Sequence, residues 1–268
     1  MKKIYLYITL ALIFASCEKV VHIDLNEANP RIVVDAQLVD TGNGLGNAII
    51  KLSWSGSFYD DNNFKPIENA SIKISDPRGK IYHFTEVKAG EYINTQMEAV
   101  YIDDEFNLEI ETNNETLSAK SSLPRYVPID SLSFAPFVFG PHRGNGFVVH
   151  CHFMDPPNEE NFYYLKLIIN DTVSSDYFIG SDDAIDGEQI DYVFFKHAIE
   201  KGAFVVVELY TIDEMAYDYF RVLKKDENSG GMSAAPGNPI SNIKGNAIGI
   251  FRASAKDEKY IIVPPFSI

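Results

Sequence analysis

The stretch Ala70-Ser-Ile-Lys-Ile-Ser75 runs into Asp76-Pro-Arg-Gly79 and then into Ile81-Tyr-His-Phe84. Its first part strictly alternates apolar with polar residues, as a strand with one buried face requires. Pro77 stands at the second corner of a tight turn, and Gly79 ends the turn. These residues predict a β-hairpin, and the hairpin sets the class of the fold.

Further strand-like segments lie on both sides of the hairpin, separated by short turns. They are rich in β-branched and aromatic residues, and no amphipathic helix interrupts them. This pattern predicts a β-sandwich over residues 31–124. The expected strands are Arg31–Val39, Ala48–Trp54, Gly90–Ile93, Phe106–Thr112 and Thr116–Lys120.

The second half follows a connector that is bracketed by Pro124 and Pro128. It contains the one convincing helix, over residues 213–225, with Thr211 and Glu214 as an expected capping box. The predicted fold is therefore mostly β, with two β-sandwich-like modules in series (31–124 and 125–268) and one α-helix in the second. Its expected strands are Ile129–Phe134, Phe147–Met154, Phe162–Ile169, Tyr192–Phe195, Phe204–Tyr210, Ile248–Ala253 and Lys259–Val263.

The start of the chain is typical of an export signal. Lys2 and Lys3 precede an apolar run from Ile4 to Phe14 that is too short to span a bilayer. Ala15 and Ser16 then precede Cys17, as in a bacterial lipobox. We expect residues 1–16 to be a signal peptide, Cys17 to be acylated, and residues 17–30 to be a lipid-anchored tether. Ordinary secretion and an uncleaved anchor are the alternatives.

Charge and cysteine content narrow the possible partners. The formal net charge of −15 disfavours binding to nucleic acid and to anionic headgroups. No second apolar run approaches the length of a spanning helix, so the bilayer is expected to be reached only through lipid on Cys17. The other cysteine, Cys151, is expected to be a small buried apolar residue.

Two clusters contain metal-ligand residue types. His150 and His152 are two positions apart on an expected strand, so both imidazoles face the same side and could reach one metal ion. Solvent-facing strand histidines are the alternative. Asp182, Asp183 and Asp186 lie in a glycine-containing loop that could hold Ca²⁺, as could residues 60–63, although solvated acidic loops would look the same.

Several longer motifs appear in a characteristic order. They are Ile32-Val-Val-Asp35, Leu52-Ser-Trp-Ser55, Ala70 to Gly79, Gly90-Glu-Tyr92, Val127-Pro-Ile-Asp130, Phe153-Met-Asp-Pro156, Asn161-Phe-Tyr-Tyr164, Tyr217-Asp-Tyr-Phe220 and Pro239 to Phe251. With the lipobox, this order resembles the Bacteroidota lipoproteins of the domain of unknown function 4249 family. The resemblance covers nearly the whole chain after Cys17.

The resemblance implies a Gram-negative outer membrane lipoprotein, from a family whose genes often sit beside those of TonB-dependent transporters. It also implies a carboxypeptidase-regulatory-like sandwich in the first half, and no known catalytic residue. We expect no cofactor, with Ca²⁺ as the alternative. Ser131 and Thr172 lie in Asp-Ser-Leu and Asp-Thr-Val triplets that look like the O-glycosylation acceptor of this phylum.

The sequence contains no Gly-x-Ser-x-Gly elbow and no phosphate-binding glycine loop. We therefore expect a non-enzymatic accessory subunit of a TonB-dependent transporter that acts in capture, as a lid or in assembly. An independent adhesin or glycan-binding module is the first alternative, and an exported metal-dependent hydrolase is the second. The sequence does not decide which face of the outer membrane the protein occupies.

Overall fold

The structure is a computed structural model that describes residues 29–56, 64–98, 100–138, 145–183, 185–228 and 239–265. The predicted signal peptide, Cys17, most of the tether and the acidic stretch 60–63 lie outside these residues. Among the described residues, none of the helical segments has the length and apolar character that a bilayer span requires.

The first module is the predicted β-sandwich. The hairpin is present, with Lys73 opposite His83, and it belongs to a four-stranded sheet of order β4-β3-β7-β8. Alternate residues of its strands pack against β1, β2 and β6 in one core. The strands of this half are β1 (Ile32–Asp40), β2 (Leu45–Trp54), β3 (Ser71–Ser75), β4 (Ile81–His83), β5 (Thr85–Lys88), β6 (Glu91–Glu98), β7 (Glu105–Thr112) and β8 (Glu115–Ser122).

The second module is also β-rich and contains the single helix of the described residues. A three-stranded sheet of order β13-β10-β9 shares a second core with β11 and β14. The expectation of a mostly β fold with two sandwich-like modules is confirmed. The elements are β9 (Ile129–Val138), β10 (Asn145–Met154), β11 (Phe162–Ile169), β12 (Thr172–Ser181), β13 (Gln189–Ile199), β14 (Phe204–Ile212), α2 (Glu214–Asn228) and β15 (Ala247–Ile262).

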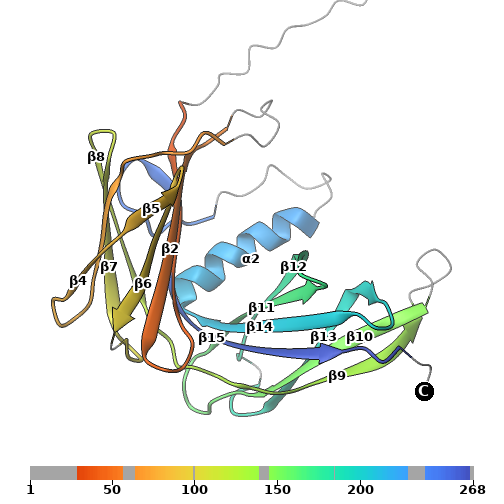
Figure 1. Cartoon of the computed structure of the whole chain (residues 1–268). Helices are drawn as coiled ribbons and strands as arrows, with labels where there is room; N and C mark the ends of the chain where they lie inside the picture. Colours follow the sequence, from red (N-terminus) through yellow and green to blue (C-terminus); the bar gives the residue numbers. More distant parts are fainter. Residues whose placement is uncertain are drawn as a thin grey trace, which may run out of the picture.

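One long strand, β15, belongs to both modules (Figure 1). Residues 247–255 pair in parallel with β1, and residues 254–262 pair antiparallel with β14. The result is a continuous eight-stranded sheet of order β12-β11-β14-β15-β1-β2-β6-β5. The module boundary at residue 124 stays a prediction. Residues 247–255, which the sequence assigns to the second module, are part of the sheet of the first sandwich. The two expected strands at the end of the chain are a single strand.

The helix begins where the sequence predicts it, but its cap is different. The Asp213 carboxylate accepts a hydrogen bond from the backbone N–H of Ala216 at 2.8 Å, so Asp213 caps α2. Thr211 is still part of β14, and its hydroxyl donates to the carbonyl of Arg125 at 2.7 Å. The expected capping box of Thr211 and Glu214 is therefore wrong, because the strand continues to Ile212 and uses the threonine elsewhere.

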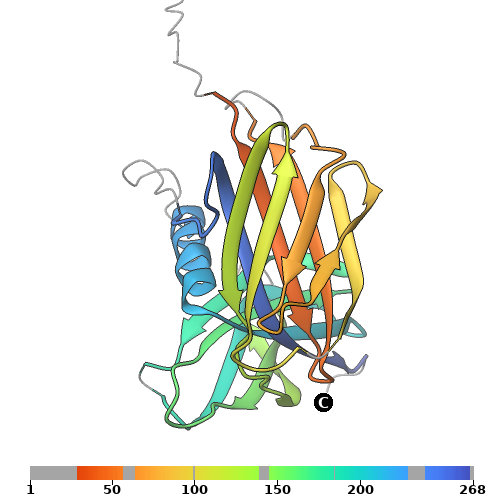
Figure 2. The ribbon, with the colours of Figure 1, turned by 90° about the vertical axis from the view of Figure 1, so that its left-hand side faces the viewer.

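The helix lies in the angle between the two modules, over one face of the eight-stranded sheet (Figures 1 and 2). It covers a third apolar cluster that is rich in aromatic rings, among them Phe162, Tyr164 and Tyr210. A chain of hydrogen bonds joins the helix to both modules: Ala253 N–H donates to Ser121 Oγ at 2.7 Å, and that hydroxyl donates to Asp213 at 2.5 Å.

Candidate functional sites

His150 and His152 project from β10 onto the outer face of the three-stranded sheet, while Val149, Cys151 and Phe153 point into the core. The predicted shared face is therefore confirmed, and the two rings are nearly parallel with centroids 6.0 Å apart. Burial raises the pKa of the Cys151 thiol to about 12, which agrees with its expected role as a buried apolar residue.

A third side chain, Asp191 of β13, joins the histidine pair. Its Oδ1 lies 3.0 Å from Nδ1 of His150 and 3.5 Å from Nδ1 of His152. On the other side, Ser133 Oγ of β9 lies 2.9 Å from Nε2 of His152. Asp191 could not be predicted as a member of this group from the sequence, because it is 41 positions from His150 and is brought close only by the pairing of β10 with β13.

The acidic loop after β12 contributes to a different set of carboxylates from the one expected. Oxygens of Asp155, Asp182 and Asp186 lie within 4.8 Å of one another, whereas Asp183 accepts a hydrogen bond from Ser181 at 2.8 Å. Asp155 and Asp182 are almost fully buried, with 0% and 3% of their surfaces exposed. Asp155, at the end of β10, was not among the predicted ligands.

The buried carboxylates in this cluster have hydrogen-bond donors from the protein. The Tyr163 hydroxyl and the Gly187 N–H donate to Asp155, and Asn161 N–H donates to Asp182 at 3.0 Å. Burial, followed by the hydrogen bond to Asp155, raises the pKa of Tyr163 well above its ordinary range. These bonds fasten the loop to the β10–β11 turn, which gives the cluster a structural role beside the calcium hypothesis.

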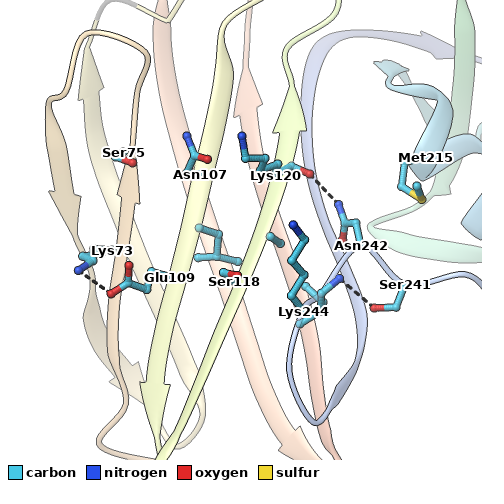
Figure 3. Close-up of a pocket in the computed structure, with 13 residues that line it drawn as sticks. Lys73, Ser75, Asn107, Glu109, Ser118, Lys120, Met215, Ser241, Asn242 and Lys244 are labelled. Carbon is cyan, nitrogen blue, oxygen red and sulfur yellow. Dashed lines mark hydrogen bonds and ion pairs between the residues drawn. The ribbon is translucent and has the colours of Figure 1, made fainter.

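A groove of about 470 Å³ lies on the outer face of β3, β7 and β8 (Figure 3). Polar and charged residues of these strands line its floor. Two of its lysines are paired with carboxylates, Lys73 with Glu109 and Lys120 with Glu105, each at 2.6 Å. Residues 241–244 form one wall, where Asn242 Nδ2 donates to the carbonyl of Lys120 at 2.9 Å. Met215 of α2 completes the lining, so both halves of the chain build the groove.

The helix-covered face of the eight-stranded sheet becomes charged beyond the helix. Lys166, Glu208 and Glu258 are register neighbours on β11, β14 and β15. Lys256 lies 3.1 Å from Glu208 and 2.7 Å from Glu258. Burial lowers the pKa of Lys166, and the nearby Arg252 lowers it further.

Past this charged row the same face is apolar and open. In the next register, Val173, Ile168, Val206 and Tyr260 stand side by side across β12, β11, β14 and β15. Phe204 and Ile262 are paired beside them, and the rings of Phe204 and Tyr260 lie 5.4 Å apart. We call these six residues the distal apolar row. Val173, Phe204, Tyr260 and Ile262 are exposed by 59%, 38%, 69% and 56%.

The two predicted glycosylation residues are both exposed, Ser131 on β9 and Thr172 at the start of β12. They lie on different sheets, so the structure does not bring them together. Cys17, the predicted lipidation site, lies outside the described residues.

Comparison with known proteins gives one family match. A model described as Domain of unknown function (DUF4249) matches residues 18–260. No curated protein matches the sequence.

Similar solved structures include a two-domain fibronectin type-III segment of chicken tenascin, with 12% identity over 69% of this chain and 91% of that one and a TM-score of 0.22. The chicken interferon gamma receptor alpha chain has 10% identity, covers 88% of this chain and 100% of its own, and gives a TM-score of 0.28. The FN1–FN3 domains of chicken CNTN1 have 9% identity over 70% of this chain and 63% of theirs, with a TM-score of 0.24.

Proposed function

The chain belongs to the domain of unknown function 4249 family, and on that premise we propose that it is a non-enzymatic outer membrane lipoprotein that serves as an accessory subunit of a TonB-dependent transporter. The lipobox-like stretch ending in Cys17 supports the membrane anchor. The observation that carries the docking role is the distal apolar row, which is the surface we assign to the transporter.

The distal apolar row has the composition of a protein-binding surface. Contiguous apolar side chains on an open sheet face are costly in water and commonly mark interaction sites. Tyr260 and Phe204 supply aromatic anchors, which are enriched at the centres of interfaces. The charged row of Lys166, Glu208, Lys256 and Glu258 borders the apolar one and provides a polar rim.

The position of the row favours a partner that is held in the same membrane. The tether leads into β1, whose first residue, Ile32, pairs with Ala247 at the start of β15, while the row lies at the other end of β15. Along a strand this separation is on the order of 40 Å. An anchor on Cys17 keeps the local concentration of the protein high beside integral membrane proteins. The row is then presented to their extramembranous parts.

Site-specific cross-linking in cells tests this proposal. A photo-reactive residue in place of Tyr260 is expected to capture a large β-barrel transporter that also co-purifies with the tagged protein from detergent extracts. The matched control places the same residue at Ile81 of β4, which is 52% exposed and lies on the other module. Extracts that repeatedly yield the protein alone, or equal capture at both positions, would contradict the proposal.

Two further measurements separate the parts of the proposal. Mass spectrometry of the protein purified from membranes is expected to find an acylated Cys17 at the N-terminus, and a free thiol or an intact leader there would contradict the anchor. Binding to a glycan or peptide array without any transporter would instead favour the independent adhesin, with the groove beside β8 as its binding surface.

A further inference from the structure

We propose that His150, His152 and Asp191 form a binding site for a divalent transition metal ion, with Zn²⁺ as the expected occupant. The site lies on the outer face of the sheet β13-β10-β9, away from the distal apolar row. It is independent of the transporter hypothesis.

The backbone holds the three ligands in place before any metal binds. His150 and His152 share a face because strand side chains alternate, and their nearly parallel rings are 6.0 Å apart. Asp191 stands directly opposite His152 on the neighbouring strand. Three ligands fixed by two hydrogen-bonded strands lose little conformational freedom when they bind an ion.

The distances between the ligand atoms fit a tetrahedral zinc site. Zinc–nitrogen and zinc–oxygen bonds of about 2.0–2.2 Å place two ligand atoms of a tetrahedron about 3.3–3.5 Å apart. Asp191 Oδ1 lies 3.0 Å from Nδ1 of His150 and 3.5 Å from Nδ1 of His152. One ligand atom of each of the three residues lies within 4.8 Å of the other two, and rotation of the rings would bring them to the tetrahedral spacing.

Ser133 adds a support that metal-binding histidines commonly have. Its Oγ lies 2.9 Å from Nε2 of His152, so it can accept the Nε2 proton. In the tautomer whose Nδ1 lone pair points towards Asp191 and can bind a metal ion, Nε2–H donates to this hydroxyl, which holds the ring in place.

The ligand types and their exposure define the class of ion. Two imidazoles and one carboxylate suit zinc and its transition-metal neighbours, whereas Ca²⁺ and Mg²⁺ prefer oxygen ligands alone. The histidine side chains are each 23% exposed and Asp191 is 48% exposed, so the fourth position faces solvent. We expect a water molecule, or a donor from another molecule, to fill it.

Calorimetric titration with ZnCl₂ tests the site on the full chain, purified with a histidine-free tag and stripped of metal with a chelator. We expect one equivalent to bind with micromolar affinity and to raise the melting temperature. His150→Ala, His152→Ala and Asp191→Asn should each weaken binding at least tenfold, and Ser133→Ala by about tenfold. His83→Ala, at an exposed residue of β4, is the matched control and should bind like the wild type.

Two results would overturn the proposal. One is a wild-type chain that takes up no Zn²⁺ under these conditions. The other is unchanged uptake by the double variant His150→Ala/His152→Ala with a circular dichroism spectrum like that of the wild type. Because all three ligands lie on an outer sheet face, these variants are expected to fold. A visible spectrum of tetrahedral Co²⁺, present in the wild type and absent in the double variant, would confirm the geometry independently.

Discussion

The two halves of β15 share one backbone but differ in surroundings. Nearly every residue of 247–255 is buried, where the strand pairs with β1 and the Ala253 N–H donates to the Ser121 hydroxyl. Residues 256–262 pair with β14 and are mostly half-buried or exposed. The first half ties the modules together, while the second presents Tyr260 and Ile262 to solvent. A single strand thus combines a structural joint with a candidate docking surface, and the two roles should respond differently to substitution.

Gly249→Ala tests the structural half and should have the largest effect. Gly249 has a φ of +116°, and a Cβ atom there would lie 1.9 Å from the carbonyl oxygen of Val34. The backbone pairing of β1 with β15 must shift, so we expect a loss of at least about 3 kcal/mol in the free energy of unfolding. Denaturant unfolding measures the loss.

The control is Gly202→Ala, at a residue that also has a positive φ, +79°, but has nothing within 4 Å of the added carbon. It should lose only about 1 kcal/mol, the cost of the backbone conformation alone. Equal losses at both positions would show that the close approach to Val34 is not what makes Gly249 necessary.

Local patterns in the sequence predicted most of the elements but not the continuity of β15. The hairpin at 70–84 and the helix follow from periodicities of 2 and 3.6 that neighbouring residues carry. Lys256, Asp257 and Glu258, by contrast, look like a polar break between two strands. The strand continues through them because Lys256 is paired with Glu208, and because Asp257 accepts the Ile129 N–H at 2.7 Å. Both partners are distant in sequence.

The candidate metal site was likewise predictable from the sequence only in part. The shared face of His150 and His152 follows from strand alternation, so the sequence alone could predict it. Asp191 and Ser133 join the pair only through the pairing of β10 with β13 and β9. The acidic cluster gains Asp155 for the same reason, since the turn and strands between it and Asp182 decide which carboxylates converge.

Ser121→Ala tests the link between the structural half of β15 and the helix. The Ser121 hydroxyl accepts from Ala253 N–H and donates to Asp213, so its removal leaves two largely buried groups without this partner. We expect a loss of about 1–3 kcal/mol in the free energy of unfolding. The neighbouring Ser122→Ala, at an exposed residue, should be nearly neutral. Equal stability of the two variants would mean that the hydrogen-bond chain does not hold the helix.

The pH dependence of stability tests the same hydrogen-bond chain through Asp213, its member next to the helix. Burial raises the pKa of the Asp213 carboxyl above its ordinary value of 3.8. The folded state therefore binds this proton more tightly than the unfolded state does. As pH falls from neutral through the raised pKa towards 3.8, the wild type should gain stability relative to Asp213→Asn, which cannot titrate. Because Asn also caps helices well, the cap itself is kept. A difference between the two proteins that is constant over a pH series would contradict this.

Substitution in the exposed half of β15 should leave the fold intact and affect only docking. Ile262 and Ile81 are both strand residues with similar exposure, 56% and 52%, but only Ile262 belongs to the distal apolar row. Replacing either by Thr keeps a β-branched side chain, so the free energy of unfolding should change by no more than about 0.5 kcal/mol. Only Ile262→Thr should reduce the amount of transporter that co-purifies. If Ile262→Thr destabilised the protein as strongly as Ser121→Ala does, the second half of β15 would be part of the structural joint, and the difference between the two halves would disappear.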